Sequence, residues 1–275
     1  MRVTIGSREY ELLVPEGQGP FPVIIGLHGG SGVISHFDEK TGLGDAGVSR
    51  GYVVLIPQGI NGAWSVGGHT TTAAAANAAD IKFLFDIVDD ASKQVPINSN
   101  ALFLVGHSNG AGFAYSLAAQ YPERVTGVGI YAGSLGGNVP TGPVNVLHIH
   151  GTNDTNVQYD GGIGPNSGQV NPPVSETMEK WVAPLTLPVK TTTTLNSFVV
   201  EDRWEDPTHT VVLWSVIGGT HAWPTFVTGA ILDFFDTLLT QEVPPKELAL
   251  TGTSESTVLF VGLGLLLLTF MVFKR

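Results

Sequence analysis

The chain of 275 residues contains no cysteine. This absence excludes disulfides, thiolate metal sites and a cysteine nucleophile, and it leaves the redox compartment undetermined, because a chain without thiols tolerates either environment. Charged residues are also scarce, at 13%, whereas hydrophobic residues make up 43%. With 35 glycines and 17 prolines, this composition favours a large core with many tight turns over disorder. We expect one large domain followed by a tail.

Basic residues are few, because 13 lysines and arginines stand against 24 acidic residues, for a formal net charge of −11. Such a chain would repel a phosphate backbone, so no nucleic-acid partner is expected. The amino-terminal residues 1–5 pass directly into alternating, strand-like sequence, without an apolar segment of signal-peptide length behind a basic start. No export signal is therefore expected in the chain as written.

Short apolar runs that end in Gly- or Pro-rich turns recur along the chain, as is typical of strands buried on both faces of a parallel sheet. These runs cover residues 22–27, 52–56, 101–105, 126–131 and 144–149. Helical stretches lie between them, one starting near Asp80 and one covering residues 112–120. The alternation predicts βαβ units and an α/β fold: a mostly parallel sheet with helices on both faces.

Residues 155–195 interrupt this alternation with many glycines and prolines and with the threonine run 191–194. We interpret this segment as an excursion over the sheet edge around one short helix near Met178 and Trp181. Late strands are expected at 197–200 and 211–214, followed by a last helix with an apolar stripe. The expected division is a domain at 1–241, a linker at 242–256 and an apolar segment at 257–275.

Gly106, Ser108 and Gly110 form a G-x-S-x-G pattern between an apolar run and a helix-forming run. In such a nucleophile elbow the serine occupies a sharp strand-to-helix turn, and the flanking glycines prevent Cβ collisions. The pattern therefore predicts Ser108 as a nucleophile, with a plain strand-to-helix turn as the alternative.

A serine hydroxyl needs a histidine to accept its proton and a carboxylate to orient that histidine. His221 lies on a Gly-rich loop after the last predicted strand, and Asp154 follows the run 144–149. The order Ser108, Asp154, His221 is that of α/β hydrolases. The other histidines considered as the base are His36, His69, His107 and His209, with His107 expected to face away from the pocket; the rival acids are Asp160 and Asp202.

His28, Gly29 and Gly30 close the first apolar run. Glycines at that place let backbone N–H groups approach the oxyanion that forms when a serine attacks a carbonyl. The predicted oxyanion donors are the N–H groups of Asn109 and Gly30, with Gly29 as a further candidate. His28 is interpreted as a structural hydrogen-bonding residue beneath that loop.

His148 and His150 alternate along a predicted strand near Asp154, which raises a metal-site interpretation. The pattern of binuclear zinc hydrolases would need an aspartate at the position of Thr152, and a serine triad leaves a metal no task. We therefore expect no metal and no other cofactor, and we interpret His148 as a core histidine.

Four segments, GLHGG, GHSNGAGFAYSLA, HIHGTNDTNVQYDGG and GGTHAWP, occur in this order along the chain. Together they resemble the poly(3-hydroxybutyrate) depolymerase family, which merges with the feruloyl and acetylxylan esterases of carbohydrate esterase family 1, over roughly residues 20–240. The resemblance implies an α/β-hydrolase fold and a serine ester hydrolase with Ser108, Asp154 and His221 as its triad. The implied substrates are hydroxyalkanoate polyesters or oligomers, or feruloyl or acetyl esters of polysaccharides.

Relatives in that family often carry a tryptophan and paired cysteines after the fourth strand; this chain keeps Trp64 but has Gly68 and His69 and no cysteine. Trp64 and Trp223 are candidates for lining an acyl or aromatic pocket, with a packing role as the alternative. Two other functions stay open. One is acyl transfer to a carbohydrate or lipid hydroxyl by the same triad, and the other is a non-catalytic surface-binding protein.

The carboxyl-terminal tail contains an unbroken apolar run at 258–273, followed by Lys274 and Arg275. The run predicts a transmembrane segment, although it is short of the ~20 residues that usually span a bilayer. Just before it, LALTG at 248–252 resembles the LAxTG signal that class E sortases cleave, which would join Thr251 to the cell envelope. The expected location is a membrane or cell wall, facing the exterior, or alternatively a tail anchor with a cytoplasmic domain.

Overall fold

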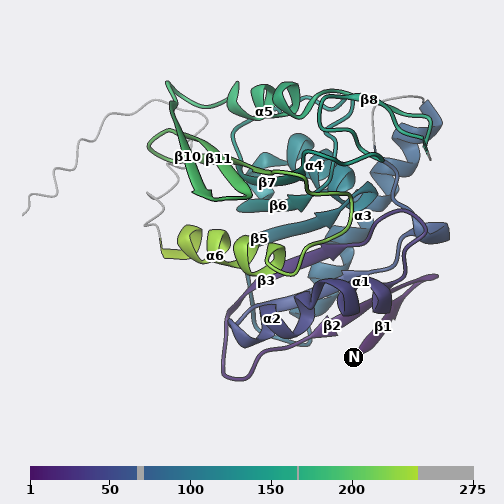
Figure 1. Cartoon of the computed structure of the whole chain (residues 1–275). Helices are drawn as coiled ribbons and strands as arrows, with labels where there is room; N and C mark the ends of the chain where they lie inside the picture. The colour runs from purple at the N-terminus through teal and green to yellow at the C-terminus, as the bar shows by residue number, and fades with distance from the viewer. Residues whose placement is uncertain (67–70, 166, 241–275) are drawn as a thin grey trace, which may run out of the picture. The chain divides into compact units, whose positions relative to one another are not determined.

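This computed structural model describes residues 1–66, 71–165 and 167–240. The described residues contain a ten-stranded sheet (Figure 1). In spatial order the strands are β1 (Arg2–Ile5), β2 (Arg8–Leu13), β4 (Val53–Pro57), β3 (Phe21–Leu27), β5 (Ile97–His107), β6 (Gly127–Tyr131), β7 (Asn145–Gly151), β12 (Thr210–Val216), β11 (Val199–Glu205) and β10 (Val189–Asn196).

The six central strands, from β4 to β12, pair in parallel, whereas the outer strands on both sides pair antiparallel. The central strands are the predicted apolar runs, and they are buried because helices cover both faces of the sheet. The predicted mostly parallel sheet is thus confirmed.

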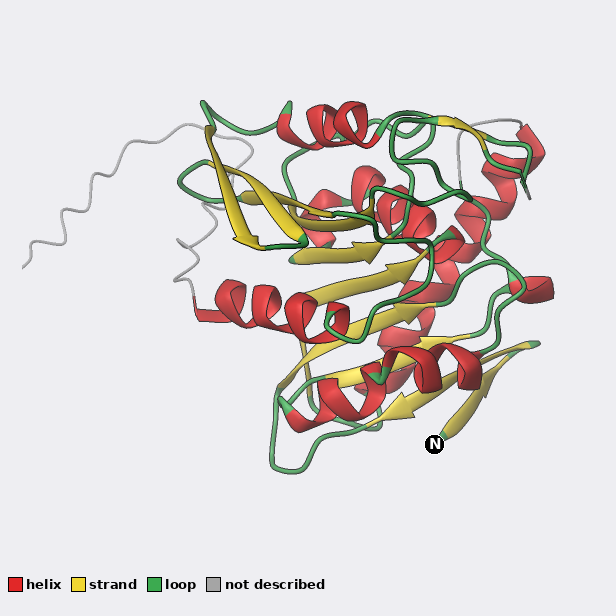
Figure 2. Ribbon diagram, in the orientation of Figure 1, coloured by secondary structure: helices red, strands yellow, loops and turns green. Residues whose placement is uncertain are grey.

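Within the described residues, six helices and two short 3-10 helices accompany the strands (Figure 2). They are α1 (Ile34–Thr41), α2 (Leu43–Ser49), η1 (Ile60–Gly62), α3 (Thr71–Ser92), α4 (Asn109–Gln120), η2 (Pro122–Arg124), α5 (Val174–Val182) and α6 (Val227–Thr240). One hydrophobic cluster joins α3, α4 and α5 to one face of the sheet, and a second joins α1, α2 and α6 to the other face.

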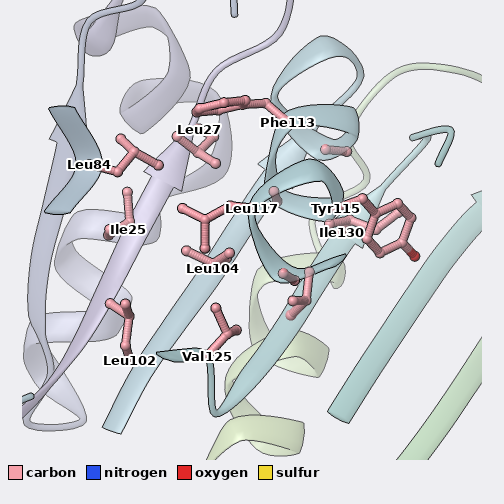
Figure 3. Packing of buried hydrophobic residues seen from close by; sticks show 14 of the residues in the cluster. Ile25, Leu27, Leu84, Leu102, Leu104, Phe113, Tyr115, Leu117, Val125 and Ile130 are labelled. Carbon is pink, nitrogen blue, oxygen red and sulfur yellow. The ribbon is translucent and has the colours of Figure 1, made fainter. Parts of the chain in front are cut away.

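Helix α4 is buried along almost its whole length, because its small residues allow it to lie close to the sheet. Leu117 of α4 belongs to the same cluster as Ile25 of β3 and Leu104 of β5, as Figure 3 shows. Close packing of this helix against the two strands holds the turn between β5 and α4 in place, and that turn carries Ser108.

The segment predicted as an excursion contains more regular structure than expected. A two-stranded ribbon, β8 (Gly162–Ile163) and β9 (Val170–Asn171), precedes α5. The threonine run then lies inside β10, which pairs with β11 at the edge of the main sheet. The interpretation of residues 191–194 as part of an irregular excursion is therefore wrong, because β-branched threonines favour an extended edge strand even without burial.

No helix within the described residues is long and apolar enough to cross a membrane. The predicted linker 242–256, Thr251 of the sorting signal and the predicted membrane segment 257–275 all lie outside the described residues, as do Gly68 and His69.

Candidate active site

Ser108 occupies the sharp turn between β5 and α4 with a left-handed backbone, φ 54° and ψ −118°. A non-glycine residue tolerates this strained conformation only when its surroundings enforce it. The glycines on either side explain how the turn fits. A Cβ at Gly106 would lie 2.6 Å from Ala111 Cα, and one at Gly110 would lie 2.2 Å from the carbonyl oxygen of Leu27. The strand, the turn and the helix therefore have the geometry of a nucleophile elbow.

The structure brings Ser108, His221 and Asp154 into one hydrogen-bonded chain. His221 Nε2 lies 2.9 Å from Ser108 Oγ, and His221 Nδ1 lies 2.8 Å from Asp154 Oδ2. A carboxylate only accepts hydrogen bonds, so Nδ1 of His221 carries the hydrogen and Nε2 is left to accept the hydroxyl proton of Ser108. The arrangement can thus transfer the proton of Ser108 to His221.

The Asp154 carboxylate is fully buried, and both of its oxygens are engaged. Oδ1 accepts hydrogen bonds from the backbone N–H groups of Asn156 and Val157, while Oδ2 faces His221 and His150. Burial alone would raise the pKa of Asp154, but the hydrogen bonds from His150 and His221 outweigh it and hold the pKa well below its usual range. Asp154 is therefore an anion in the folded protein at neutral pH.

The loop that carries His221 is held by side chains from the central strands. His107, at the end of β5, donates from Nε2 to the carbonyl oxygen of His221 over 2.9 Å, and its ring lies 5.1 Å from the His221 ring. Tyr131, at the end of β6, donates its hydroxyl to the carbonyl oxygen of Thr220 over 2.5 Å. His107 is also among the residues around the cavity described below, while its buried ring packs against Tyr131 and Trp223.

The N–H of Asn109 is the first of helix α4, so it has no acceptor inside the helix. The Asn109 side chain is fixed by two bonds to the backbone of Trp64: Oδ1 accepts from the N–H, and Nδ2 donates to the carbonyl oxygen. Gly29 and Gly30 lie next to this turn, since a Cβ at Gly29 would be 3.4 Å from Ser108 Cβ and one at Gly30 would be 3.8 Å from Asn109 Cβ. The residues predicted to supply the oxyanion donors thus belong to segments that lie beside Ser108.

His28 lies beneath this loop and is buried. Its Nε2 accepts the N–H of Gly59 over 3.0 Å, so its Nδ1 carries the hydrogen that is donated to the carbonyl oxygen of Gly29 over 2.8 Å. This pair of bonds joins the end of β3 to the loop after β4, and the interpretation of His28 as a structural residue is confirmed.

Trp64 and Trp223 are both buried, and neither lines the cavity at Ser108. Trp64 stacks on Phe113 and donates its indole N–H to the carbonyl oxygen of His28. Trp223 packs edge-on against His107 and donates to Thr228 Oγ1. The expectation that these rings line a substrate pocket is therefore corrected. Each supports the backbone behind the site, because its apolar ring is packed and its one polar atom is satisfied.

A cavity of about 980 Å³ opens over Ser108 at the carboxyl ends of the parallel strands. Part of its lining comes from the loop after β3 and from α1, including Val33, His36 and Lys40. Another part comes from Asn156, Val157, Ser167 and residues 169–171. Amide side chains are frequent in the lining, at Asn61, Asn109, Asn156, Gln169 and Asn171. Its volume suits a small organic ligand or one end of a polymer.

Among the described residues, the rival acids Asp160 and Asp202 and the rival bases His36 and His209 form no hydrogen bond to Ser108, His221 or Asp154. Asp160 is exposed, and Asp202 pairs with Thr192 and Lys190 on the edge hairpin. His209 bonds to Thr208 in the turn before β12, and His36 is an exposed residue of the cavity wall. His69 lies outside the described residues.

His148 and His150 form a buried pair on β7, and hydrogen bonds engage every ring nitrogen of the pair. His148 Nε2 lies 2.9 Å from His150 Nδ1, while the outer nitrogens contact Tyr115 Oη and the carbonyl oxygen of Val157. Burial lowers the pKa of His148 far below its ordinary value. Both imidazoles thus belong to a buried hydrogen-bond network. This burial agrees with the interpretation of His148 as a core histidine.

A sequence model of the family described as "Esterase PHB depolymerase" matches residues 9–154 of the chain. A curated relative, "Putative esterase NocK" from Nocardia uniformis subsp. tsuyamanensis, is 30% identical over 152 residues, covering 54% of this chain and 43% of that protein. "Probable feruloyl esterase C" from Aspergillus niger is 29% identical over 172 residues, covering 58% and 59%. The chain thus spans about half the length of the curated relatives it matches.

Among solved structures, the acetyl xylan esterase from Aspergillus awamori superposes with a TM-score of 0.64 at 17% identity, covering 86% of this chain and 98% of that one. At this identity the likeness shows the fold alone. The predicted α/β-hydrolase fold is confirmed by it for the part of the chain that superposes.

Proposed function

The chain belongs to the family of PHB depolymerase-type esterases, and from that membership we propose that it hydrolyses carboxylic esters with Ser108 as the nucleophile. The observation that carries the proposal is the chain of hydrogen bonds from Ser108 Oγ through His221 to Asp154. A serine at a sharp turn, with these hydrogen bonds to a histidine and an aspartate and with backbone N–H donors beside it, is the arrangement that acyl transfer requires.

In the first half of the reaction, Ser108 Oγ attacks the ester carbonyl carbon while His221 Nε2 takes the hydroxyl proton. The oxyanion of the tetrahedral intermediate accepts hydrogen bonds from the N–H of Asn109 and from Gly30 or Gly29. When the intermediate collapses, His221 returns the proton to the alcohol that leaves, and the acyl group stays on Ser108 as an ester.

In the second half, His221 accepts a proton from water, and the hydroxide oxygen attacks the acyl-enzyme. The second tetrahedral intermediate uses the same N–H donors and releases the carboxylic acid, while Ser108 regains its proton from His221. Throughout both halves Asp154 remains ionised and stabilises the positive charge that forms on His221.

For the substrate we propose an acyl ester of a polar, hydroxyl-bearing alcohol, such as a feruloyl or acetyl ester of a polysaccharide. The amide residues Asn61 and Gln169 around the cavity support this class, because amides both donate to and accept from hydroxyl groups. The named relatives that are feruloyl esterases support it as well. Hydroxyalkanoate oligomers are the competing class.

The deciding experiment measures turnover of p-nitrophenyl acetate, methyl ferulate, acetylated xylan and a hydroxybutyrate oligomer by the full chain and by Ser108→Ala. The substitution should lower kcat by about 10⁴-fold or more and should abolish labelling by a fluorophosphonate probe. Ser49→Ala is the matched control, because Ser49 is exposed at the end of α2 and bonds only to Ala46. Unchanged turnover in Ser108→Ala would refute the proposed nucleophile.

We also propose, on the sequence of residues 248–273 alone, that the domain is attached to a membrane or cell wall. Fractionation of cells that express the chain with and without residues 242–275 tests this. Recovery of both forms in the same soluble fraction would contradict it.

A further inference from the structure

Three fully buried polar side chains form a hydrogen-bonded row that ends at the turn carrying Asp154. Tyr115 Oη of α4 lies 2.8 Å from His148 Nδ1, and His148 Nε2 lies 2.9 Å from His150 Nδ1. His150 Nε2 then lies 2.8 Å from the carbonyl oxygen of Val157 and 3.4 Å from Asp154 Oδ2. The reaction as described above makes no use of Tyr115, His148 or His150.

The direction of this row follows independently from each of its ends. At one end, a buried tyrosine hydroxyl must donate, so His148 Nδ1 accepts and neutral His148 carries its hydrogen on Nε2. At the other end, the carbonyl oxygen of Val157 can only accept, so His150 carries a hydrogen on Nε2. The two results agree, since His148 Nε2 donates to an unprotonated His150 Nδ1. Every donor in the row therefore points in one direction, from Tyr115 toward the turn that carries Asp154 and Val157.

The last hydrogen of the row reaches the segment that determines where Asp154 lies. His150 Nε2 faces both the Val157 carbonyl and Asp154 Oδ2, which is the same oxygen that accepts from His221 Nδ1. The other carboxylate oxygen is held only within its own turn, by the N–H groups of Asn156 and Val157. Backbone hydrogen bonds, such as that from the Asp154 N–H to the carbonyl oxygen of Gly151, already join that turn to the end of β7. His150 adds the side-chain contact from β7 that reaches the carboxylate itself.

We propose that His150 is a positioning residue for the Asp154 carboxylate and that His148 and Tyr115 keep its imidazole in the required tautomer. The inference rests on the proposed function, because Asp154 matters only if His221 acts as a base. The row does not conduct protons, since its far end is Tyr115, which is fully buried against Trp181 with 5.0 Å between the ring centroids. Its effect is therefore on the geometry of Asp154.

Two substitutions at His150 separate positioning from simple core packing. A glutamine places its amide nitrogen near the site of Nε2, so His150→Gln keeps the donor toward Val157 and Asp154. An asparagine reaches only the site of Nδ1, so His150→Asn keeps the contact with His148 and loses that donor. Both replace a buried ring by a smaller amide and should lower the melting temperature to a similar extent.

The expected result is that His150→Asn lowers kcat by about ten- to a hundred-fold with little change in KM, because a small displacement of a catalytic group has effects of this size. His150→Gln should stay within about threefold of the unsubstituted chain. Equal kcat values in the two variants would overturn the proposal, whether both are high or both are low. Rates are compared after the background rate of Ser108→Ala is subtracted. If the unsubstituted chain shows no turnover, the proposed function is wrong, and this result differs from a failure of the positioning role.

A second measurement does not depend on activity or on the folding of a variant. The ¹⁵N chemical shifts of the imidazoles in the unsubstituted chain at neutral pH report which nitrogen carries the hydrogen. His148 and His150 should both be neutral with the hydrogen on Nε2. A hydrogen on Nδ1 of His150, or a charged ring there, would overturn the proposal.

Discussion

His107 Nε2 donates a hydrogen bond to the carbonyl oxygen of His221 across 2.9 Å. The residue that directly precedes Ser108 therefore holds the backbone of the residue that faces Ser108 Oγ. One peptide bond and one hydrogen bond connect the two partners, and the bond from Tyr131 to Thr220 braces the same loop from the neighbouring strand. This double support explains how a loop residue keeps a fixed distance to Ser108.

Removing the donor at position 107 should slow the reaction without weakening substrate binding. In His107→Phe the ring can still pack against Trp223, but the carbonyl oxygen of His221 loses its partner, so we expect kcat to fall about ten- to a hundred-fold while KM stays within about twofold. His107→Gln keeps a donor near the site of Nε2 and is the matched control, with a smaller loss. Steady-state kinetics on both variants test this, and equal rates for them would contradict it.

Burial also makes His107 a source of acid sensitivity. Its pKa falls to about 3 because burial disfavours the charged ring. In the unfolded chain the His107 side chain takes up a proton near pH 6.5, whereas in the folded chain it stays neutral down to about pH 3. Protonation therefore favours unfolding, and stability is lost as the pH falls through this window. Between about pH 7.5 and about pH 5, this group alone should reduce the free energy of unfolding by about 2 kcal/mol.

Urea denaturation of the unsubstituted chain and of His107→Gln at those two pH values measures this contribution. Burial lowers the pKa of His28 and His148 as well, so part of the acid sensitivity should remain in the variant. The difference between the two chains should shrink by about 2 kcal/mol on acidification. A difference that does not change with pH would show that His107 does not titrate in this way.

The sequence predicted those parts of the fold that depend on local signals. The central strands were visible because strands buried on both faces are continuous apolar runs. Strand β10 was not, since all eight of its residues are exposed and its pairing with β11 leaves no apolar periodicity to detect. Helices α1 and α2 also escaped prediction, because each spans about two turns and offers too short a window for a period to show.

At the site, the elbow at Ser108 and the order of Asp154 and His221 were readable because turn glycines and chain order are local or linear features. The roles of His107, Trp64 and His150 depend on contacts between residues far apart in the chain, such as His107 and His221, which are 114 positions apart. The one signal for His107 in the sequence was that it directly precedes the predicted nucleophile. For Trp64, nothing in the sequence distinguished a cavity wall from the layer behind it.

The two buried tryptophans should affect stability rather than substrate affinity. Trp64→Phe keeps a ring that can stack on Phe113 but leaves the carbonyl oxygen of His28 without its indole donor, and Trp223→Phe does the same to Thr228. Each should lower the free energy of unfolding by about 1–2 kcal/mol and leave KM nearly unchanged. Chemical denaturation and steady-state kinetics test this. A large rise in KM at unchanged stability would restore the role in substrate binding.

The close approach of the elbow to β3 leaves no room for a side chain at Gly110. A Cβ there would lie 2.2 Å from the carbonyl oxygen of Leu27 and 2.4 Å from that of His28, and both are backbone atoms that move only if β3 and α4 separate. Gly110→Ala should therefore lower the free energy of unfolding by about 3 kcal/mol or more and abolish turnover, because the separation also shifts Gly29 and Gly30. Gly229→Ala is the control, since no atom lies within 4 Å of its Cβ position in α6. It should raise stability by about 0.5–1 kcal/mol, and equal effects of the two substitutions would contradict this account of the elbow.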